Sequence, residues 1–350
     1  MDRDIPVIAD GDDLGTHRVI EPKGALPQPA LRVDNDFSRR FSTEIVVDVE
    51  ILNIDAASFR QMEEASGGPD GVPAVVRKTI ADRGKQHNPV TGSGGMLLGR
   101  VAWVGEKARK RGVVAGDRVA TLASLSLTPL SISEIRGVRA TSAQLDVTGQ
   151  AVIFGAAPFA KMPSDFDDRV ALALLDVAGA APQVARRAAP GDFVLVLGAG
   201  GKSGLLCCAE ARRRVGAAGK VIGIESYAPF ADELRAMGLC DAVVSADARD
   251  PLAVRAAVLA ALGREADVTF SCVNVDGVEM SAIVATRQRG TVYFFAMTTS
   301  FTRAALGAEG VGKDVELAIG NGYAENHAEH TLDLVRSSAP LRELMSRRYG

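Results

Sequence analysis

The stretch DFVLVLGAGGKSG, residues 192–204, joins five apolar residues from Phe193 to Leu197 to a turn with four glycines. A mostly apolar run from Leu205 to Ala211 follows, and then VIGIE, which ends at Glu225. A short apolar run before a glycine cluster indicates a buried strand, and a longer run after it indicates a helix. The order strand, turn, helix, strand predicts one βαβ unit of about thirty residues.

Each glycine of this turn has a physical task. Gly198 permits a tight turn at the end of the strand, and Gly200 lets the backbone approach a pyrophosphate. Gly204 lets the helix lie close to the sheet. Free N–H groups and the helix dipole favour a phosphate at the start of the helix, where Gly201 and Ser203 lie. We therefore expect Gly198, Gly200, Gly201, Ser203 and Gly204 to bind a dinucleotide cofactor.

Glu225 indicates which dinucleotide is bound. It lies 21 residues beyond Gly204, at the tip of the second strand. A carboxylate there bonds the ribose 2′-OH and repels a 2′-phosphate, which favours NAD over NADP. Lys202 does not indicate a P-loop, because GxxxxGK[ST] is absent. The alternative interpretation is a glycine-rich turn in another kind of α/β protein.

Length and composition limit the class of protein. With 350 residues, 47% hydrophobic residues and a net charge of −3, the chain predicts two domains and no nucleic-acid partner. No apolar run reaches membrane-spanning length, and the acidic N-terminus does not resemble a signal peptide. The four cysteines lack metal-ligand spacing and are expected to be free thiols. We expect a cytoplasmic enzyme with no membrane partner.

Two domains differ in their pattern. Residues 1–163 predict a β-rich catalytic domain, with antiparallel strands such as 44–52 and 96–104, and residues 1–40 form an irregular arm with at most one short strand. Residues 164–350 predict a doubly wound parallel-sheet domain with C-terminal helices, because apolar strands alternate with helices. Its first helix is expected to follow a cap at Ser164 or Asp165.

The order of these parts resembles that of the medium-chain dehydrogenase/reductase superfamily. The residues that carry the resemblance are Leu98–Val101, Gly116–Val119 and Gly198–Gly204. The resemblance implies an α/β protein with a GroES-like catalytic domain and a Rossmann domain. Zinc members carry a Cys after the first long strand and a GHE-type motif before the second, where this chain has Asp55 and Gly94-Gly95-Met96. A catalytic zinc needs three good ligands, so we predict no metal.

A closer resemblance covers nearly the whole chain. The chain is similar to the L-erythro-3,5-diaminohexanoate dehydrogenase family in seven segments: GDDLGTHRVIEPKGALPQPA (11–30), LNIDAASF (52–59), ATLASLSLTPL (120–130), LDVAGA (175–180), LGAGGKSG (197–204), EGVGKDV (309–315) and IGNGY (319–323). This resemblance implies NAD-dependent oxidative deamination of the 3-amino group, giving 5-amino-3-oxohexanoate and ammonia in lysine fermentation.

Asp55 is the first candidate for catalysis, because it stands where the superfamily has its first metal ligand. It could anchor the reacting amine or take its proton, and the alternative is a helix cap. Asn53 and Ser58 flank it on the same turn and could bind substrate or cap the helix.

Three residues of the arm are further candidates. A desolvated Lys23 could act as base or could pair with the substrate carboxylate. Arg18 competes for the carboxylate, and His17 could shuttle a proton. The alternative for all three is a solvated arm. Asn274 and Thr298 end the fourth and fifth strands of the second domain and are expected to contact the nicotinamide ribose and carboxamide.

Two other functions remain open from the sequence. One is a zinc-independent quinone- or enoyl-type reductase, and the other is a non-enzymatic nucleotide-sensing or structural protein. A homo-oligomer is also expected, because residues 314–319 would form an unpaired apolar edge strand that a second copy could cover.

Overall fold

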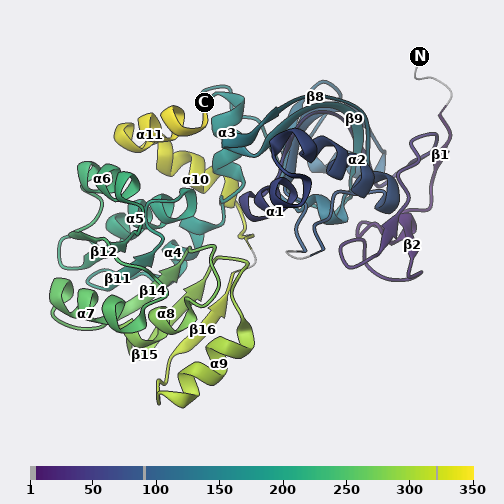
Figure 1. Cartoon of the computed structure of the whole chain (residues 1–350). Helices are drawn as coiled ribbons and strands as arrows, with labels where there is room; N and C mark the ends of the chain where they lie inside the picture. The colour runs from purple at the N-terminus through teal and green to yellow at the C-terminus, as the bar shows by residue number, and fades with distance from the viewer. Residues whose placement is uncertain (1–4, 90–91, 321) are drawn as a thin grey trace. The chain divides into compact units, whose positions relative to one another are not determined.

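The chain divides into two units, residues 1–176 and 177–350, and the computed structural model describes residues 5–89, 92–320 and 322–350 (Figure 1). The sequence pattern placed the boundary at 163/164, before helix α3 (Asp168–Leu175). The difference has a physical cause, because α3 is tied to the first unit. Arg118 donates two hydrogen bonds to Asp168, at 2.8 and 2.7 Å, and Arg169 donates to Asp146 at 2.8 Å.

The first unit is built on a six-stranded sheet in which every neighbouring pair is antiparallel. Apolar residues along its strands alternate with exposed ones such as Asp48, so one face packs into a core. The predicted β-rich unit is confirmed. In sheet order the strands are β10 (Phe159–Lys161), β7 (Arg118–Thr121), β6 (Met96–Val104), β5 (Ile45–Asn53), β9 (Gln144–Ile153) and β8 (Leu130–Arg139). Two helices accompany them, α1 (Ala56–Ser66) and α2 (Val72–Arg83).

The N-terminal arm has more order than the sequence predicted. It holds two small sheets: β1 (Val7–Ile8) pairs with β4 (Arg40–Phe41), and β2 (Val19–Glu21) pairs with β3 (Arg32–Val33). The expectation of at most one short strand was wrong, because a buried arginine between these strands organises the arm.

That arginine, Arg18, is fully buried and uses all five of its N–H donors. Two bind the carboxylate of the equally buried Glu44, at 2.7 and 2.8 Å. The others reach the Asp36 carbonyl at 2.7 Å, the Arg39 carbonyl at 3.2 Å and Asp34 at 3.4 Å. The pair lowers the pKa of Glu44, against the opposing effect of its burial. One ion pair thus fastens the arm to the start of β5.

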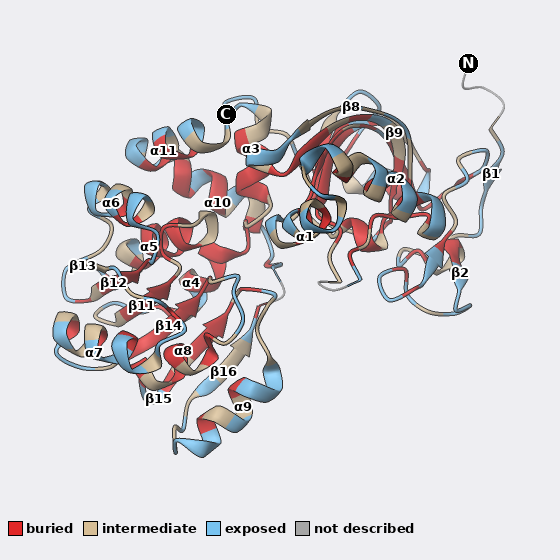
Figure 2. Cartoon of the chain, in the orientation of Figure 1, coloured by how far each residue is buried: buried red, intermediate tan, exposed pale blue. Residues whose placement is uncertain are grey.

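The second unit is a parallel six-stranded sheet between two helical layers, which confirms the doubly wound Rossmann prediction. Its central strands are buried on both faces, as Figure 2 shows in red. The sheet order is β13 (Ala242–Val244), β12 (Lys220–Ile224), β11 (Phe193–Leu197), β14 (Ala266–Ser271), β15 (Thr286–Phe294) and β16 (Glu316–Ile319), so β16 is an edge strand, as expected.

Helices cover both faces of this sheet (Figure 1). One layer holds α4 (Ala180–Arg187), α5 (Lys202–Val215) and α10 (His327–Arg336), and the other holds α7 (Pro251–Leu262), α8 (Glu279–Ala285) and α9 (Phe301–Gly310). Helix α6 (Ala228–Met237) packs beside β13, and α11 (Ala339–Tyr349) packs beside α10. No helix in the described ranges is long and apolar enough to cross a bilayer.

Two details of the helices differ from the sequence prediction. The long helix expected after residue 164 is two helices, α3 and α4, and Asp167 caps α3 by accepting from the Arg169 N–H at 2.9 Å. Asp167 lies closer to the first helical residue than Ser164 or Asp165, and this explains the difference. Helix α9, capped by Ser300, was not predicted.

The Arg18–Glu44 pair yields a stability prediction. In Arg18→Met the Glu44 carboxylate stays buried without its partner, so the first unit should lose about 3–5 kcal/mol of unfolding free energy. Urea unfolding followed by the fluorescence of Trp103 reports on this unit, because Trp103 is the single tryptophan and lies in β6. Lys78→Met, which removes an exposed partner of Asp82, is the control. Equal midpoints for the two variants would contradict the role of the pair.

Candidate functional site

The glycine turn of the second unit leaves no room for side chains at two of its positions. A Cβ on Gly204 would lie 2.1 Å from the Gly198 carbonyl oxygen, and one on Gly200 would lie 2.6 Å from the Cβ of Phe230. Gly198 itself has a φ of +71°, which ends β11 in a tight turn. The three glycines therefore bring the strand, the turn and the helix as close together as their sequence spacing predicts.

The start of α5 is suited to an anion. Its N-cap residue is Gly201, which has no side chain. The first N–H groups of the helix, near Ser203, therefore receive no hydrogen bond from a capping side chain. A Cβ on Gly201 would meet only the Gly198 carbonyl oxygen, at 3.6 Å, so the space beside it is open. Both features fit a pyrophosphate at the helix N-terminus.

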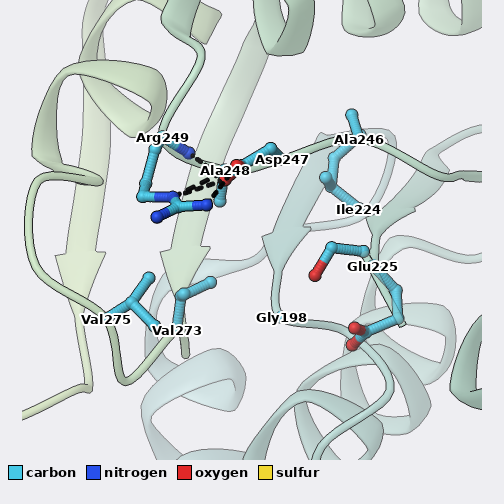
Figure 3. A pocket seen from close by; sticks show the side chains of 10 residues that line it. Gly198, Ile224, Glu225, Ala246, Asp247, Ala248, Arg249, Val273 and Val275 are labelled. Atoms are coloured by element: carbon cyan, nitrogen blue, oxygen red, sulfur yellow. Dashed lines mark hydrogen bonds and ion pairs between the residues drawn. The ribbon is translucent and has the colours of Figure 1, made fainter.

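Glu225 follows β12 and braces the turn. One of its carboxylate oxygens accepts from the Gly200 N–H at 3.0 Å, and the other accepts from the Tyr227 N–H at 2.9 Å. Each oxygen keeps a further lone pair for a ribose hydroxyl. Glu225 also lines a pocket of about 280 Å³ beside Gly198 (Figure 3).

The pocket contains polar residues that the sequence analysis missed. Ser226 follows β12. Asp247 and Arg249 follow β13 (Figure 3). Hydrogen bonds from Arg249 lower the pKa of Asp247 to about 2, so its carboxylate is charged at neutral pH. Their positions directly after predicted strands could have identified them, because ligands bind at the carboxyl ends of parallel strands. Val273 and Val275 supply the apolar wall.

The loops after β14 and β15 contact each other. The Thr298 hydroxyl lies 3.4 Å from the Val273 carbonyl oxygen and 3.5 Å from that of Val275, and exposed Asn274 stands between these two valines. The structure therefore brings Asn274 and Thr298 together next to the pocket wall. Their contact with a nicotinamide remains a prediction.

Arg348, near the C-terminus of helix α11, is a second side chain that holds the glycine turn. Its guanidinium donates to the Gly200 carbonyl at 2.7 Å, lies 3.7 Å from the centroid of the Phe230 ring and pairs with Glu233. Its side chain is only 10% exposed. No motif in the sequence points to this residue, because it lies 148 positions beyond Gly200.

In the first unit, Asp55 begins α1. One oxygen accepts from the Ser58 N–H at 2.9 Å, and so the capping interpretation is confirmed. The other oxygen, Oδ2, is buried and has no hydrogen-bond partner in the described part of the chain. Asn53 accepts from Gln144 at 3.0 Å, while its own Nδ2 is buried without a partner. Asn53, Asp55 and buried Ser58 thus lie together at one helix start.

Two positions of the segment that matches the GHE-type zinc motif, Gly94 and Gly95, have no room for a side chain. A Cβ on Gly94 would lie 2.2 Å from the Gln86 carbonyl oxygen, and one on Gly95 would lie 2.1 Å from the Asn53 carbonyl oxygen. Backbone atoms therefore fill the space that an imidazole or thiolate would need. Within residues 5–89, 92–320 and 322–350, no group of three His, Cys, Asp or Glu residues is placed to hold a metal.

The arm residues that the sequence suggested for catalysis or substrate binding lie in surroundings that differ from those these roles require. Arg18 has no donor left for a substrate carboxylate, and His17 Nε2 lies 2.9 Å from Glu44 Oε1. Lys23 is exposed, so it lacks the desolvation that a lysine base requires. All three residues flank strand β2, which lies apart from helix α1 in the first unit (Figure 1). The geometry gives Arg18 and His17 structural contacts, and it does not support substrate contact by Arg18.

The buried lysine of the first unit is Lys85, in the turn after α2. Its Nζ donates to the carbonyls of Pro27 at 2.7 Å and Gln28 at 3.0 Å. Burial, with a smaller effect of Arg83, lowers the pKa of Lys85 to about 8. The sequence analysis did not single out Lys85 or its neighbours Gln86 and His87. Residue 321, within the IGNGY segment, lies outside the described residues.

A β-rich antiparallel unit followed by a Rossmann unit with this turn is the fold of the medium-chain dehydrogenases/reductases. The mycobacterial protein Rv1454c complexed with NADPH matches with a TM-score of 0.55 and 17% identity, covering 87% of this chain and 88% of that one. Escherichia coli quinone oxidoreductase complexed with NADPH matches with a TM-score of 0.51 and 18% identity, covering 88% and 81%. These likenesses establish the fold.

Sequence relatives identify the family. A family model described as the L-erythro-3,5-diaminohexanoate dehydrogenase N-terminal domain matches residues 17–163. Curated enzymes named L-erythro-3,5-diaminohexanoate dehydrogenase from Acetoanaerobium sticklandii and Fusobacterium nucleatum are 49% and 47% identical to this chain, each covering 97% of it and 99% of the relative. The chain belongs to the L-erythro-3,5-diaminohexanoate dehydrogenase family.

The contact between Arg348 and the glycine turn yields a binding prediction. Arg348→Met removes the donor that holds the Gly200 carbonyl, so the Kd for NADH should rise about three- to tenfold, as expected for about 1 kcal/mol. Titration of NADH fluorescence measures it without turnover. Arg347→Met is the matched control, because Arg347 also pairs with Glu233 and no described contact joins it to Gly200. A similar loss in both variants would assign the effect to Glu233 instead.

Proposed function

We propose that this chain catalyses the nicotinamide-dependent oxidative deamination of L-erythro-3,5-diaminohexanoate at C3, giving 5-amino-3-oxohexanoate. The observation that carries the proposal is identity of 49% and 47%, over nearly the whole chain, with enzymes that bear this name. In the balanced reaction, substrate, NAD⁺ and water give the ketone, ammonium, NADH and one proton. We place this activity in the cytoplasm, within lysine degradation.

The chain's own residues must bind a diamine and take a proton. The bound cofactor supplies the acceptor for the hydride that leaves C3. Before that transfer the C3 ammonium loses a proton, so a base near the amine is needed. The free Oδ2 of Asp55 is suited to hold the ammonium and accept the proton, because its partner oxygen already fixes the side chain on the Ser58 N–H. Backbone at Gly94 and Gly95 fills the usual metal positions, so we propose that the reaction is zinc-independent.

We propose NAD rather than NADP as the cofactor. Glu225 and Asp247 follow the carboxyl ends of β12 and β13, and both line the pocket, where either carboxylate would repel a 2′-phosphate (Figure 3). Arg249, which could otherwise attract that phosphate, is paired with Asp247 at 2.6 Å.

We also propose a homo-oligomer formed through β16. The edge strand and the neighbouring helix α9 expose large apolar side chains: Ile319 at 60%, Phe301 at 64% and Leu306 at 63%. An unpaired edge with exposed apolar groups is a surface that a second copy can cover by strand pairing and burial.

The activity is tested with purified protein, NAD and L-erythro-3,5-diaminohexanoate. NADH and ammonia should appear in equal amounts. Asp55→Asn keeps a capping side chain but loses the charge, so kcat/KM should fall by about 10²–10⁴-fold. Asp167→Asn, the corresponding change at the cap of α3, is the matched control and should keep wild-type activity. No NADH despite tight NAD binding would contradict the proposal and direct the search to quinones and enones as hydride acceptors.

The cofactor preference is tested by the ratio of kcat/KM with NAD to that with NADP. We expect a ratio of at least about ten, since one unfavourable charge contact of about 1.4 kcal/mol has that effect. Glu225→Gln retains an oxygen for the Gly200 N–H and should lower the ratio, whereas Glu309→Gln, on exposed α9, should not. An unchanged ratio in Glu225→Gln would show that Glu225 only braces the turn.

A further inference from the structure

Six buried side-chain atoms of the first unit have no hydrogen-bond partner in the described part of the chain. Two of them, Thr43 Oγ1 and Arg118 Nε, lie elsewhere in the sequence, and the other four belong to two short segments: Asn53 Nδ2, Asp55 Oδ2, Gln86 Oε1 and His87 Nδ1. Buried polar groups in native proteins are nearly always paired, and an unpaired one lowers stability. Two short segments with four such atoms therefore require an explanation other than folding.

The two segments are neighbours, although more than thirty positions separate them in the sequence. A Cβ on Gly94 would lie 2.2 Å from the Gln86 carbonyl oxygen, and a Cβ on adjacent Gly95 would lie 2.1 Å from the Asn53 carbonyl oxygen. Since consecutive Cα atoms are about 3.8 Å apart, those two carbonyl oxygens lie within roughly 11 Å of each other. Side chains from residues 53, 55, 86 and 87 can therefore converge on one ligand.

Three of the four atoms are hydrogen-bond acceptors. Asp55 Oδ2 and Gln86 Oε1 accept by their chemistry. His87 Nδ1 can accept when the ring is neutral, and burial, with Lys85 and Arg83, lowers the pKa of His87 and keeps it neutral near pH 7. A primary ammonium group offers three N–H donors and one positive charge. The three acceptors equal the three N–H donors of this group in number, and the one negative charge of Asp55 is opposite to its positive charge.

We propose that Asp55, Gln86 and His87 form an alkylammonium-binding subsite that takes a primary ammonium group of the substrate. The proposal rests on the proposed function, whose substrate carries two such groups. Because the three acceptors are shielded from water, their bonds to a charged donor gain strength. Asn53 Nδ2 is a donor and cannot serve the ammonium, but it suits the carbonyl oxygen that replaces the amine in the product.

Binding of a simple amine tests the subsite without turnover. Propylammonium chloride should raise the thermal midpoint of the first unit, followed by Trp103 fluorescence, by about 2–4 °C at saturating concentration. Tetramethylammonium chloride at equal ionic strength is the control, because it has the charge but no N–H donor. An equal shift with both salts would overturn the proposal, even if the enzyme oxidises the diamine.

Variants of Gln86 separate ligand binding from folding. Gln86→Leu removes the unpaired acceptor, so it should raise the midpoint of the free protein and abolish the propylammonium shift. Gln86→Glu keeps an acceptor and should retain the shift. Gln150→Leu is the matched control, because Gln150 lies in β9 of the same unit and bonds Asp48 at 3.0 Å. A Gln86→Leu protein that binds propylammonium like the wild type would overturn the proposal.

Kinetics identify the ammonium group, once turnover is established. If the subsite holds the C3 ammonium, Gln86→Leu should raise KM at least about tenfold for both the diamine and 3-aminobutanoate. If it holds the C5 ammonium, KM should rise for the diamine only. Either result supports the subsite, and the second would assign the removal of the C3 proton to a base other than Asp55. Unchanged KM for both substrates would exclude it, whereas absence of turnover in the wild type would contradict the proposed function and leave the propylammonium result to decide.

Discussion

The close packing of backbone at Gly94 and Gly95 is the constraint on which the first unit's site depends. No Cβ fits at either position, because carbonyl oxygens of Gln86 and Asn53 lie about 2 Å from where it would stand. This packing has two consequences at once. It leaves no room for a side chain at positions 94 and 95, and it brings the turn after α2 against the start of α1. The same two glycines therefore shape the surroundings of Asp55.

The second unit uses an equally tight arrangement at Gly200. Glu225 accepts from its N–H and Arg348 donates to its carbonyl, so both polar backbone groups of one residue are held by side chains from distant elements. A turn fixed in this way need not be ordered when a dinucleotide binds, and preorganisation of this kind increases affinity. Helix α11 therefore supports the cofactor site, although it follows the glycine turn by more than 130 positions in the sequence.

Most of the fold could be predicted from local pattern, because each strand of the second unit is a short apolar run and the glycine turn marks its first crossover. The elements that were missed depend on contacts distant in sequence. Arg18 orders the arm only because Glu44 is buried beside it, and α3 joins the first unit through Arg118. The site followed the same rule: Asp55 stood at a recognisable position, whereas Gln86 and Arg348 lie in segments with no motif.

The contrast between Arg18 and Asp55 separates structural from functional polar residues. Both are chemically suited to a substrate with charged groups, and both stood as candidates. Every donor of Arg18 is used within the protein, so its burial stabilises the arm and leaves nothing for a ligand. Asp55 uses one oxygen to cap α1 and keeps the other unpaired, in a region where three more polar atoms are unpaired. Folding alone would favour apolar groups there, and the ammonium subsite that we propose accounts for their cost in stability.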